Sequence, residues 1–314
     1  MRYGEQHMGK KKNTPPAADD MPSGFNAMQD LNRLLAKQNF QSKAEIEAFM
    51  QKMQDEGIPE FEPDGAIEEA EELVLEGYTS ETPRAIELAR QALELDHECI
   101  GAFDLLGRCE TLVAVRICYF KRGVDLGREL FDEEFTAMHR GHFWLHLDTR
   151  PFMRCMQGYA ESLFYLGDLF EAMDTWIDMI DLNPGDNLGV RQYLLLTHAG
   201  LIMEKEFKEL DKRYKDDAFC STLYNRALMA FTAKRKNADK LLRDAIQQNP
   251  HVVDLLLAEE EPDAQGPGSV MLGSREEAMG YTDLARSIWE NVPDCMEWVE
   301  RVAKEPRQGA MKLV

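Results

Sequence analysis

Hydrophobic and polar positions follow helical periodicity over most of the chain, most clearly in the segment from Met153 to Asp186. Apolar and small residues recur there every three or four positions, in two runs that are separated by Gly167 and followed by Pro184. Side chains at this spacing lie on one face of a helix. Glycine is typical of the turn after a helix, and proline is common just beyond a helix end. The segment therefore predicts two antiparallel helices joined by a short turn.

This helix-turn-helix unit resembles the tetratricopeptide repeat, whose period is about 34 residues. The positions that carry the resemblance are Ala160, Leu163, Gly167, Ala172, Trp176, Met179 and Pro184. A later segment has small and apolar residues at related positions and ends at Pro250, 66 residues after Pro184 and close to two periods. One such unit cannot bury its own apolar face. The resemblance therefore implies neighbouring units that stack into a solenoid with a concave binding surface.

Weaker periodicity extends this pattern in both directions. We expect an all-α fold, a right-handed α-solenoid of tetratricopeptide-like helix-turn-helix repeats with helical caps. Ser42 and Glu45 form a capping-box pattern that predicts a helix start. Ser274 predicts another in the C-terminal part, where we expect the cap to close the open end of the stack. The expected parts are a disordered tail at 1–24, an N-terminal helical cap at 25–62, the solenoid at 66–258 and a C-terminal helical cap at 259–314.

The C-terminal sequence NPHVVDLLL, followed by GSREEAMGYTDLARSIWENVPDCMEWV, resembles the suppressor of tumorigenicity family, another group of helical-repeat proteins. Members of that family carry N-terminal membrane segments, whereas this sequence has no run of about 18 apolar residues. Its N-terminal lysines also lack the apolar segment of a secretory signal. Six cysteines without C-x-x-C spacing are expected to be small core residues in a reducing compartment. We therefore expect a cytoplasmic protein.

The charge balance narrows the class of partner. The chain has 36 basic and 57 acidic side chains and a net charge of -21. Nucleic-acid binding depends on Lys and Arg that neutralise phosphates, so this balance argues against nucleic acid and against anionic membrane surfaces. A protein or peptide partner is expected, and a basic one is favoured electrostatically. The sequence does not indicate an oligomeric state.

The first helices of the expected repeats supply the candidate binding groove. Aromatic and aliphatic anchors beside a few arginines are typical of peptide-binding surfaces. The candidate groove residues are Arg154, Gln157, Glu161, Phe164, Arg191, Leu195, His198, Tyr224 and Phe231. The alternative is that these side chains pack against the next repeat or the C-terminal cap, because a first helix buries one side while it exposes the other.

Three histidines form the cluster that most suggests metal binding or catalysis. On a continuous helix, the spacing of His139, His142 and His146 would place three imidazoles on one face, as metal coordination requires. Gly141 interrupts that helix, and the sequence has no H-E-x-x-H motif and no evident fourth ligand. The alternative is that these histidines cap or pack within an insert.

The sequence also lacks the motifs of nucleophile elbows and phosphate-binding loops. We therefore predict a non-catalytic adaptor or scaffold without a cofactor, which binds a peptide or helix of another protein. The rival is a metal-binding protein or metal-dependent hydrolase that uses the histidines between residues 139 and 148.

Overall fold

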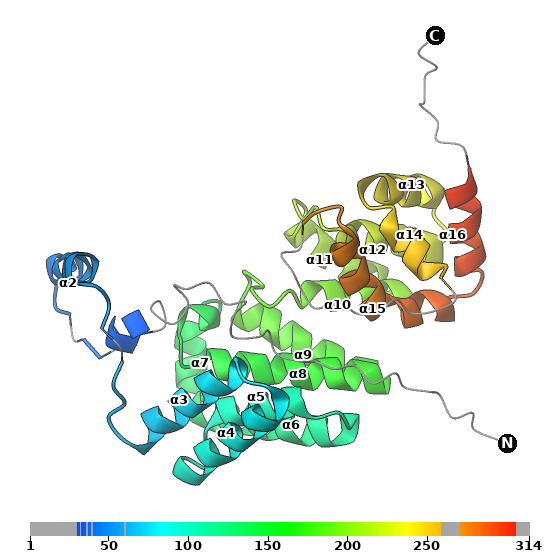
Figure 1. The fold of residues 1–314 in the computed structure, drawn as a ribbon. Helices are drawn as coiled ribbons and strands as arrows, with labels where there is room; N and C mark the ends of the chain where they lie inside the picture. Colours follow the sequence, from blue (N-terminus) through cyan, green and yellow to red (C-terminus); the bar gives the residue numbers. More distant parts are fainter. Residues whose placement is uncertain are drawn as a thin grey trace. The chain divides into compact units, whose positions relative to one another are not determined.

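The computed structural model describes residues 30–31, 33–35, 37–38, 40–59, 61–258 and 271–305. The expected tail at 1–24, and residues 259–270 and 306–314 of the expected C-terminal cap, lie outside these ranges. Every regular element within them is a helix (Figure 1). No helix in these ranges combines the length and the apolar character that a membrane span needs.

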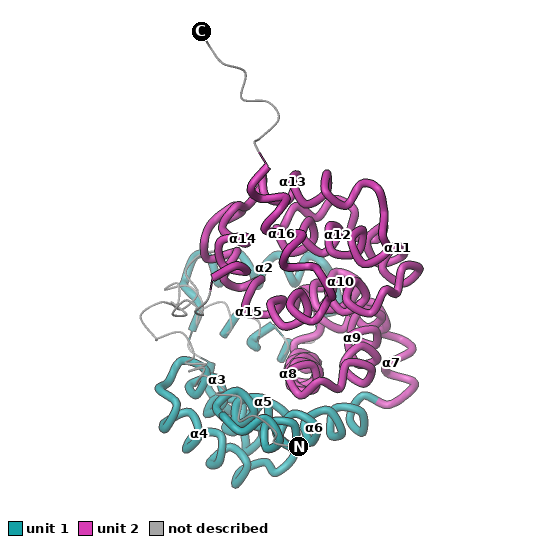
Figure 2. The backbone as a smooth tube through the Cα atoms, turned by 90° about the vertical axis from the view of Figure 1, so that its right-hand side faces the viewer, with its two compact units in different colours: residues 1–131 teal, residues 132–314 magenta. Residues whose placement is uncertain are grey.

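The chain divides into two compact units, residues 1–131 and 132–314 (Figure 2). The boundary falls inside the segment 66–258 that was expected to form one solenoid. Phe131 ends the first unit, directly after a long helix. Asp132 begins the second unit, where its carboxylate accepts a hydrogen bond from the backbone N–H of Phe135 (2.8 Å) and caps a new helix.

The first unit contains paired helices at the expected places. Its helices are α2 (Lys43–Glu56), α3 (Ala66–Tyr78), α4 (Thr82–Leu95), α5 (Ile100–Cys109) and α6 (Val113–Leu130). The side chain of Ser42 caps α2 by accepting a hydrogen bond from the backbone N–H of Glu45, as its sequence predicts. Helix α3 packs against α4 and α5, and α5 packs against α6. Buried alanines on α4 allow close packing around a core that α3 and α5 complete.

Helices α5 and α6 approach closely at Gly107. A Cβ atom at this position would lie 2.6 Å from a ring carbon of Phe120 on α6. Glycine is therefore required here for a steric reason.

The second unit contains the segment that resembles a repeat most clearly. Its elements are α7 (Glu133–His139), the 3₁₀-helix η2 (Phe143–Leu145), α8 (Arg150–Leu166), α9 (Leu169–Leu182), α10 (Arg191–Gly200), α11 (Glu204–Arg213), α12 (Cys220–Thr232), α13 (Ala238–Gln248), α14 (His251–Leu256), α15 (Arg275–Asn291) and α16 (Cys295–Lys304). Helices α8 and α9 are the two helices predicted between Met153 and Asp186. Gly167 ends α8 with a left-handed backbone (φ 93°) that suits glycine. Two further pairs, α10 with α11 and α12 with α13, lie between Pro184 and Pro250.

Trp176 joins one helix pair to the next. It lies on α9, is fully buried, and its ring centroid is 5.8 Å from that of Phe164 on α8. The same ring is 4.8 Å from Tyr193 on α10. A fully buried aromatic side chain of this size contributes strongly to the stability of the packed helices. Trp176 therefore fastens α8 and α9 to α10.

The C-terminal helices pack against several earlier helices of the second unit. Helix α15 packs against α10, α12 and α14, while α16 packs against α13, α14 and α15. Ser274 caps α15 through the backbone N–H of Glu277 (3.1 Å), as predicted. Because α10 and α12 are the first helices of two successive pairs, α15 covers the very side on which we placed the groove.

Candidate functional site

Two candidate groove residues lie in the core beneath α15. Leu195 on α10 and Tyr224 on α12 are both 0% exposed. The Tyr224 ring is 5.9 Å from that of Tyr281 and 6.2 Å from that of Trp289, both on α15. Its hydroxyl donates to the backbone carbonyl of Asn249 (2.8 Å). Tyr224 therefore packs against the C-terminal helix α15, and neither side chain leaves surface for a partner.

A chain of buried hydrogen bonds holds α15 in place. The Tyr281 hydroxyl donates to Oδ1 of Asn225 on α12 (2.8 Å), and the indole N–H of Trp289 donates to the same hydroxyl (2.8 Å). Nδ2 of Asn225 donates to the backbone carbonyl of Gln192 on α10 (3.3 Å). Burial raises the pKa of Tyr281 well above its usual value, so the hydroxyl keeps its proton and its role as a donor. We call Asn225, Tyr281 and Trp289 the polar seam.

A buried carboxylate makes the second polar link. Glu277 on α15 is 6% exposed and accepts hydrogen bonds from the backbone N–H groups of Cys220 (2.8 Å) and Gly273 (2.7 Å) and from Nδ2 of Asn249 (2.9 Å). A buried charge is costly unless such donors surround it. Cys220 begins α12, so the carboxylate also lies at the positive end of that helix. Burial, followed by the charge of Glu277, raises the pKa of the Cys220 thiol, which stays protonated.

Phe231, a third candidate groove residue, contacts α16. Its ring stacks on that of Trp298 with centroids 4.3 Å apart and an interplanar angle of 16°. The Trp298 indole N–H donates to Oδ1 of Asp239 on α13 (2.8 Å). The outer end of the expected groove is therefore also occupied by the chain itself.

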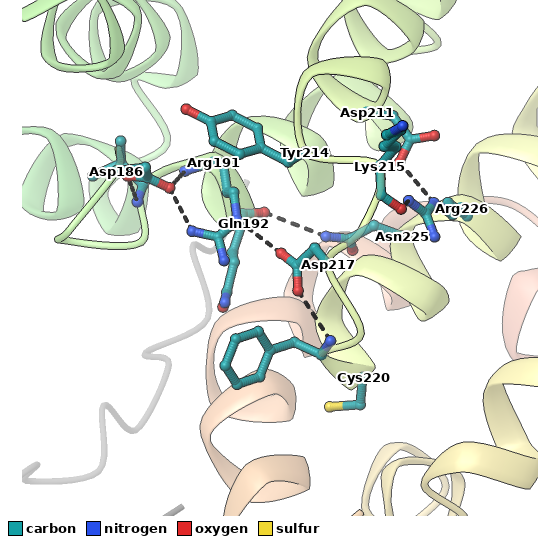
Figure 3. Close-up of polar contacts among 12 residues, drawn as sticks. Asp186, Arg191, Gln192, Asp211, Tyr214, Lys215, Asp217, Cys220, Asn225 and Arg226 are labelled. Atoms are coloured by element: carbon teal, nitrogen blue, oxygen red, sulfur yellow. Dashed lines mark hydrogen bonds and ion pairs between the residues drawn. The ribbon is translucent and has the colours of Figure 1, made fainter. Parts of the chain in front are cut away.

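Arg191 is held between two aspartates (Figure 3). Its Nη1 donates to Asp186 (2.8 Å) and its Nε to Asp217 (2.7 Å), and the guanidinium lies 5.3 Å from the ring centroid of Tyr214. The Arg191 side chain is only 15% exposed. Burial raises the pKa of Asp186, although its hydrogen bonds to Arg191 act in the opposite direction. Arg191 thus joins the turn after α9 to the segment before α12. The sequence had placed this side chain in the candidate peptide-binding groove.

Two more candidates are buried on the first helices. Phe164 on α8 is 5% exposed, with its ring centroid 5.9 Å from that of Tyr193. His198 on α10 is 4% exposed, and its Nδ1 has no hydrogen-bond partner. Burial lowers the pKa of His198, which favours the neutral imidazole. Both residues contribute to packing between helices.

Three candidates keep partial exposure on α8. Arg154, Gln157 and Glu161 are all half-buried. Nε2 of Gln157 donates to Glu161 (2.9 Å), which also accepts from the hydroxyl of Tyr193 (2.9 Å). Tyr165, one turn beyond Glu161, is 47% exposed. Spacings of three, four and four residues place these side chains on one helix face, which we call the α8 row (Arg154, Gln157, Glu161 and Tyr165).

The histidines lie on no continuous helix. Helix α7 ends at His139, and His142 and His146 flank the short helix η2. The rings of His139 and His146 are in contact, with centroids 4.2 Å apart, and Phe135 lies 4.4 Å from His139. His142 is exposed. In the part of the chain that the structure describes, no group of three or more His, Cys, Asp or Glu side chains is placed to hold a metal ion.

Sequence reasoning missed Asn225 and Glu277, which do most to position α15. A signal was available for Asn225, because an amide next to Tyr224 and one turn before Leu228 interrupts an apolar helix face. A polar residue in such a position needs a buried partner. Its partner Tyr281, however, is 56 positions away.

Comparison with protein-family models, with curated proteins and with solved structures found no match to this chain. The likenesses to the tetratricopeptide repeat and to the suppressor of tumorigenicity family therefore stay predictions.

Proposed function

We propose that this protein is a non-catalytic adaptor or scaffold, a tetratricopeptide-like α-solenoid that binds a helix of another protein on its first helices. The observation that carries the proposal is the packing of α15 against α10 and α12. Aromatic side chains, the polar seam and the Glu277 carboxylate together hold that helix. Two first helices of this chain, α10 and α12, thus already pack against a helix from a distant part of the sequence, and binding of a helix in a groove is a common mode of peptide recognition.

The α8 row contains the candidate groove residues that keep partial exposure in their own unit. Arg154, Gln157 and Glu161 are polar side chains that keep partial exposure over about two turns of α8, and Tyr165 adds an exposed aromatic side chain one turn further on. Tyrosine and arginine are enriched among the residues that dominate binding energy at interfaces. The net charge of -21 favours a basic partner by accelerating encounter.

The cysteines support a reducing location. All six are free, and four are buried. Burial raises the pKa of Cys99 to about 11 and that of Cys295 to about 12, so these thiols stay protonated and unreactive. We propose a cytoplasmic location, which free thiols of this kind support.

Quantitative affinity capture from the native cell tests the proposal. We would compare wild type with Arg154→Ala/Gln157→Ala on the α8 row and with Lys208→Ala/Glu209→Ala on the exposed side of α11 as the matched control. The expected result is a protein that wild type and control retain and that the α8-row variant loses. Capture of the same proteins in equal amounts by all three would overturn binding at the α8 row.

A further inference from the structure

A basic segment of the chain lies against an acidic helix in the first unit. Its two cations are Arg33 and Lys37, which are four positions apart. The Arg33 guanidinium lies 4.6 Å from the ring centroid of Phe61, and Nζ of Lys37 lies 4.4 Å from it. Phe61 is 6% exposed and Leu31 is 7% exposed. The segment therefore combines an apolar anchor with two cations over one aromatic ring.

The same two cations pair with α3. Arg33 contacts Glu71 (3.4 Å) and Glu72, and Nζ of Lys37 contacts Glu68 (2.7 Å). The hydrogen bond from Lys37 is the main cause that lowers the pKa of Glu68. Glu68 and Glu72 are each two positions from the fully buried Ala70, which places them on the opposite side of α3. We call Phe61, Glu68, Glu71 and Glu72 the acidic face.

We propose that the acidic face is a docking surface for a basic helix of another protein, and that Arg33 and Lys37 occupy it until such a partner displaces them. The inference rests on the proposed function and adds the chemistry of the partner: two cations one turn apart beside a leucine-like anchor. Helix α3 carries five glutamates and no basic residue, so it is complementary to such a helix.

The cations of a partner can replace Arg33 and Lys37 at the glutamates of α3, because several of these side chains are exposed to solvent. The side chains of Glu71, Glu72 and Lys37 are 54%, 39% and 36% exposed, whereas those of Glu68 and Arg33 are 28% and 14% exposed. Ion pairs with one partner this exposed are weak and screened by salt. Tethering gives the segment an effective concentration of about millimolar order, which compensates for weak contacts. A free partner must compete with the tethered segment. Its apparent affinity is therefore its intrinsic affinity multiplied by the fraction of chains in which the acidic face is open.

The experiment uses a fluorescently labelled synthetic peptide of residues 25–41 as the probe and the full-length chain as the receptor. Arg33→Glu/Lys37→Glu removes the internal competitor without deleting any part of the chain. Lys43→Glu/Lys52→Glu makes the same change of charge on α2, whose lysines pair with glutamates of their own helix. Circular dichroism melting of each variant verifies that it is folded.

We expect the peptide to bind Arg33→Glu/Lys37→Glu at least about tenfold more tightly than it binds wild type or the α2 control. Adding Glu68→Gln, Glu71→Gln and Glu72→Gln to the first variant is expected to abolish that gain. Equal affinity for wild type and Arg33→Glu/Lys37→Glu, or a gain that survives the glutamine substitutions, would overturn the inference. Neither result bears on the α8 row, so a partner lost only by Arg154→Ala/Gln157→Ala would still support the proposed function.

Discussion

Replacing Glu277 with glutamine tests how α15 is held against the stack. Both carboxylate oxygens accept hydrogen bonds, Oε1 from the backbone N–H of Cys220 and Oε2 from Asn249 and Gly273. Glutamine has the same shape, but one of its two terminal atoms is a donor. Its better orientation keeps the two bonds of Asn249 and Gly273 and turns the amide NH₂ toward the N–H of Cys220. One bond is lost, and two donors face each other in the core.

The magnitude follows from these partners. A hydrogen bond to a charged group contributes about 1.5–3 kcal/mol, and leaving a buried donor unpaired costs about 1–3 kcal/mol. Because part of this cost relaxes, we expect Glu277→Gln to lower the opening free energy of α15 by about 2–4 kcal/mol. Glu276→Gln is the control, since it removes the same charge from an exposed side chain in the same first turn. Its effect on the helix dipole is expected to be less than about 1 kcal/mol.

Hydrogen exchange of the backbone amides between Arg275 and Asn291 measures this opening directly. A tenfold change in rate corresponds to about 1.4 kcal/mol. Glu277→Gln should therefore accelerate exchange in α15 by about 30- to 700-fold relative to wild type. Equal exchange in Glu277→Gln and Glu276→Gln would refute the argument that the carboxylate anchors the helix.

Four further predictions test other parts of the structure. Trp176→Ala should destabilise the second unit by about 3–5 kcal/mol, and an unchanged melting temperature would contradict its role between α8, α9 and α10. Gly107→Ala should cost about 1–3 kcal/mol through overlap with the Phe120 ring, which denaturant unfolding would reveal. Burial lowers the pKa of His198, so the unfolded chain takes up its proton first and stability falls as pH drops below about 6.5. His198→Gln should flatten the melting temperature between pH 7.5 and 5 relative to wild type, and parallel curves would argue against this assignment. Protein purified without an affinity tag should carry no stoichiometric zinc, whereas zinc near one per chain that disappears in His139→Ala would favour the metal-binding alternative.

Helix pairs were predictable where the signal is local. The spacing of apolar residues predicts each helix of the pair α8 and α9, and Gly167 and Pro184 predict where the two helices end. Each of these signals extends over only a few residues. The short helix α7 was missed because none of its residues is buried, so its sequence carries no apolar period. The division into two compact units at Phe131 and Asp132 has no local signal either. It depends on which helices contact one another and not on any local pattern.

The candidate site was predictable only in part, because contacts between distant parts of the chain leave no local pattern in the sequence. Leu195 and Tyr224 were recognised as large apolar residues on first helices, and they are. An apolar face that binds a partner and one that binds a later part of its own chain have the same local sequence. What distinguishes them is a contact such as that between Cys220 and Glu277, 57 positions apart. The polar side chains that hold α15, such as Asn225 and Glu277, are scattered along the sequence, so helical periodicity does not reveal them.

Photo-crosslinking from the α8 row tests the central claim most directly. A photoreactive amino acid at Gln157 in the full-length protein, activated in the native cell, would be compared with the same group at Lys208 on α11. The proposed function predicts adducts from Gln157 that map to one segment with helical apolar spacing in one partner protein and that are missing from Lys208. The same scattered adducts from both positions, or none from Gln157, would contradict a helix-binding role for the first helices.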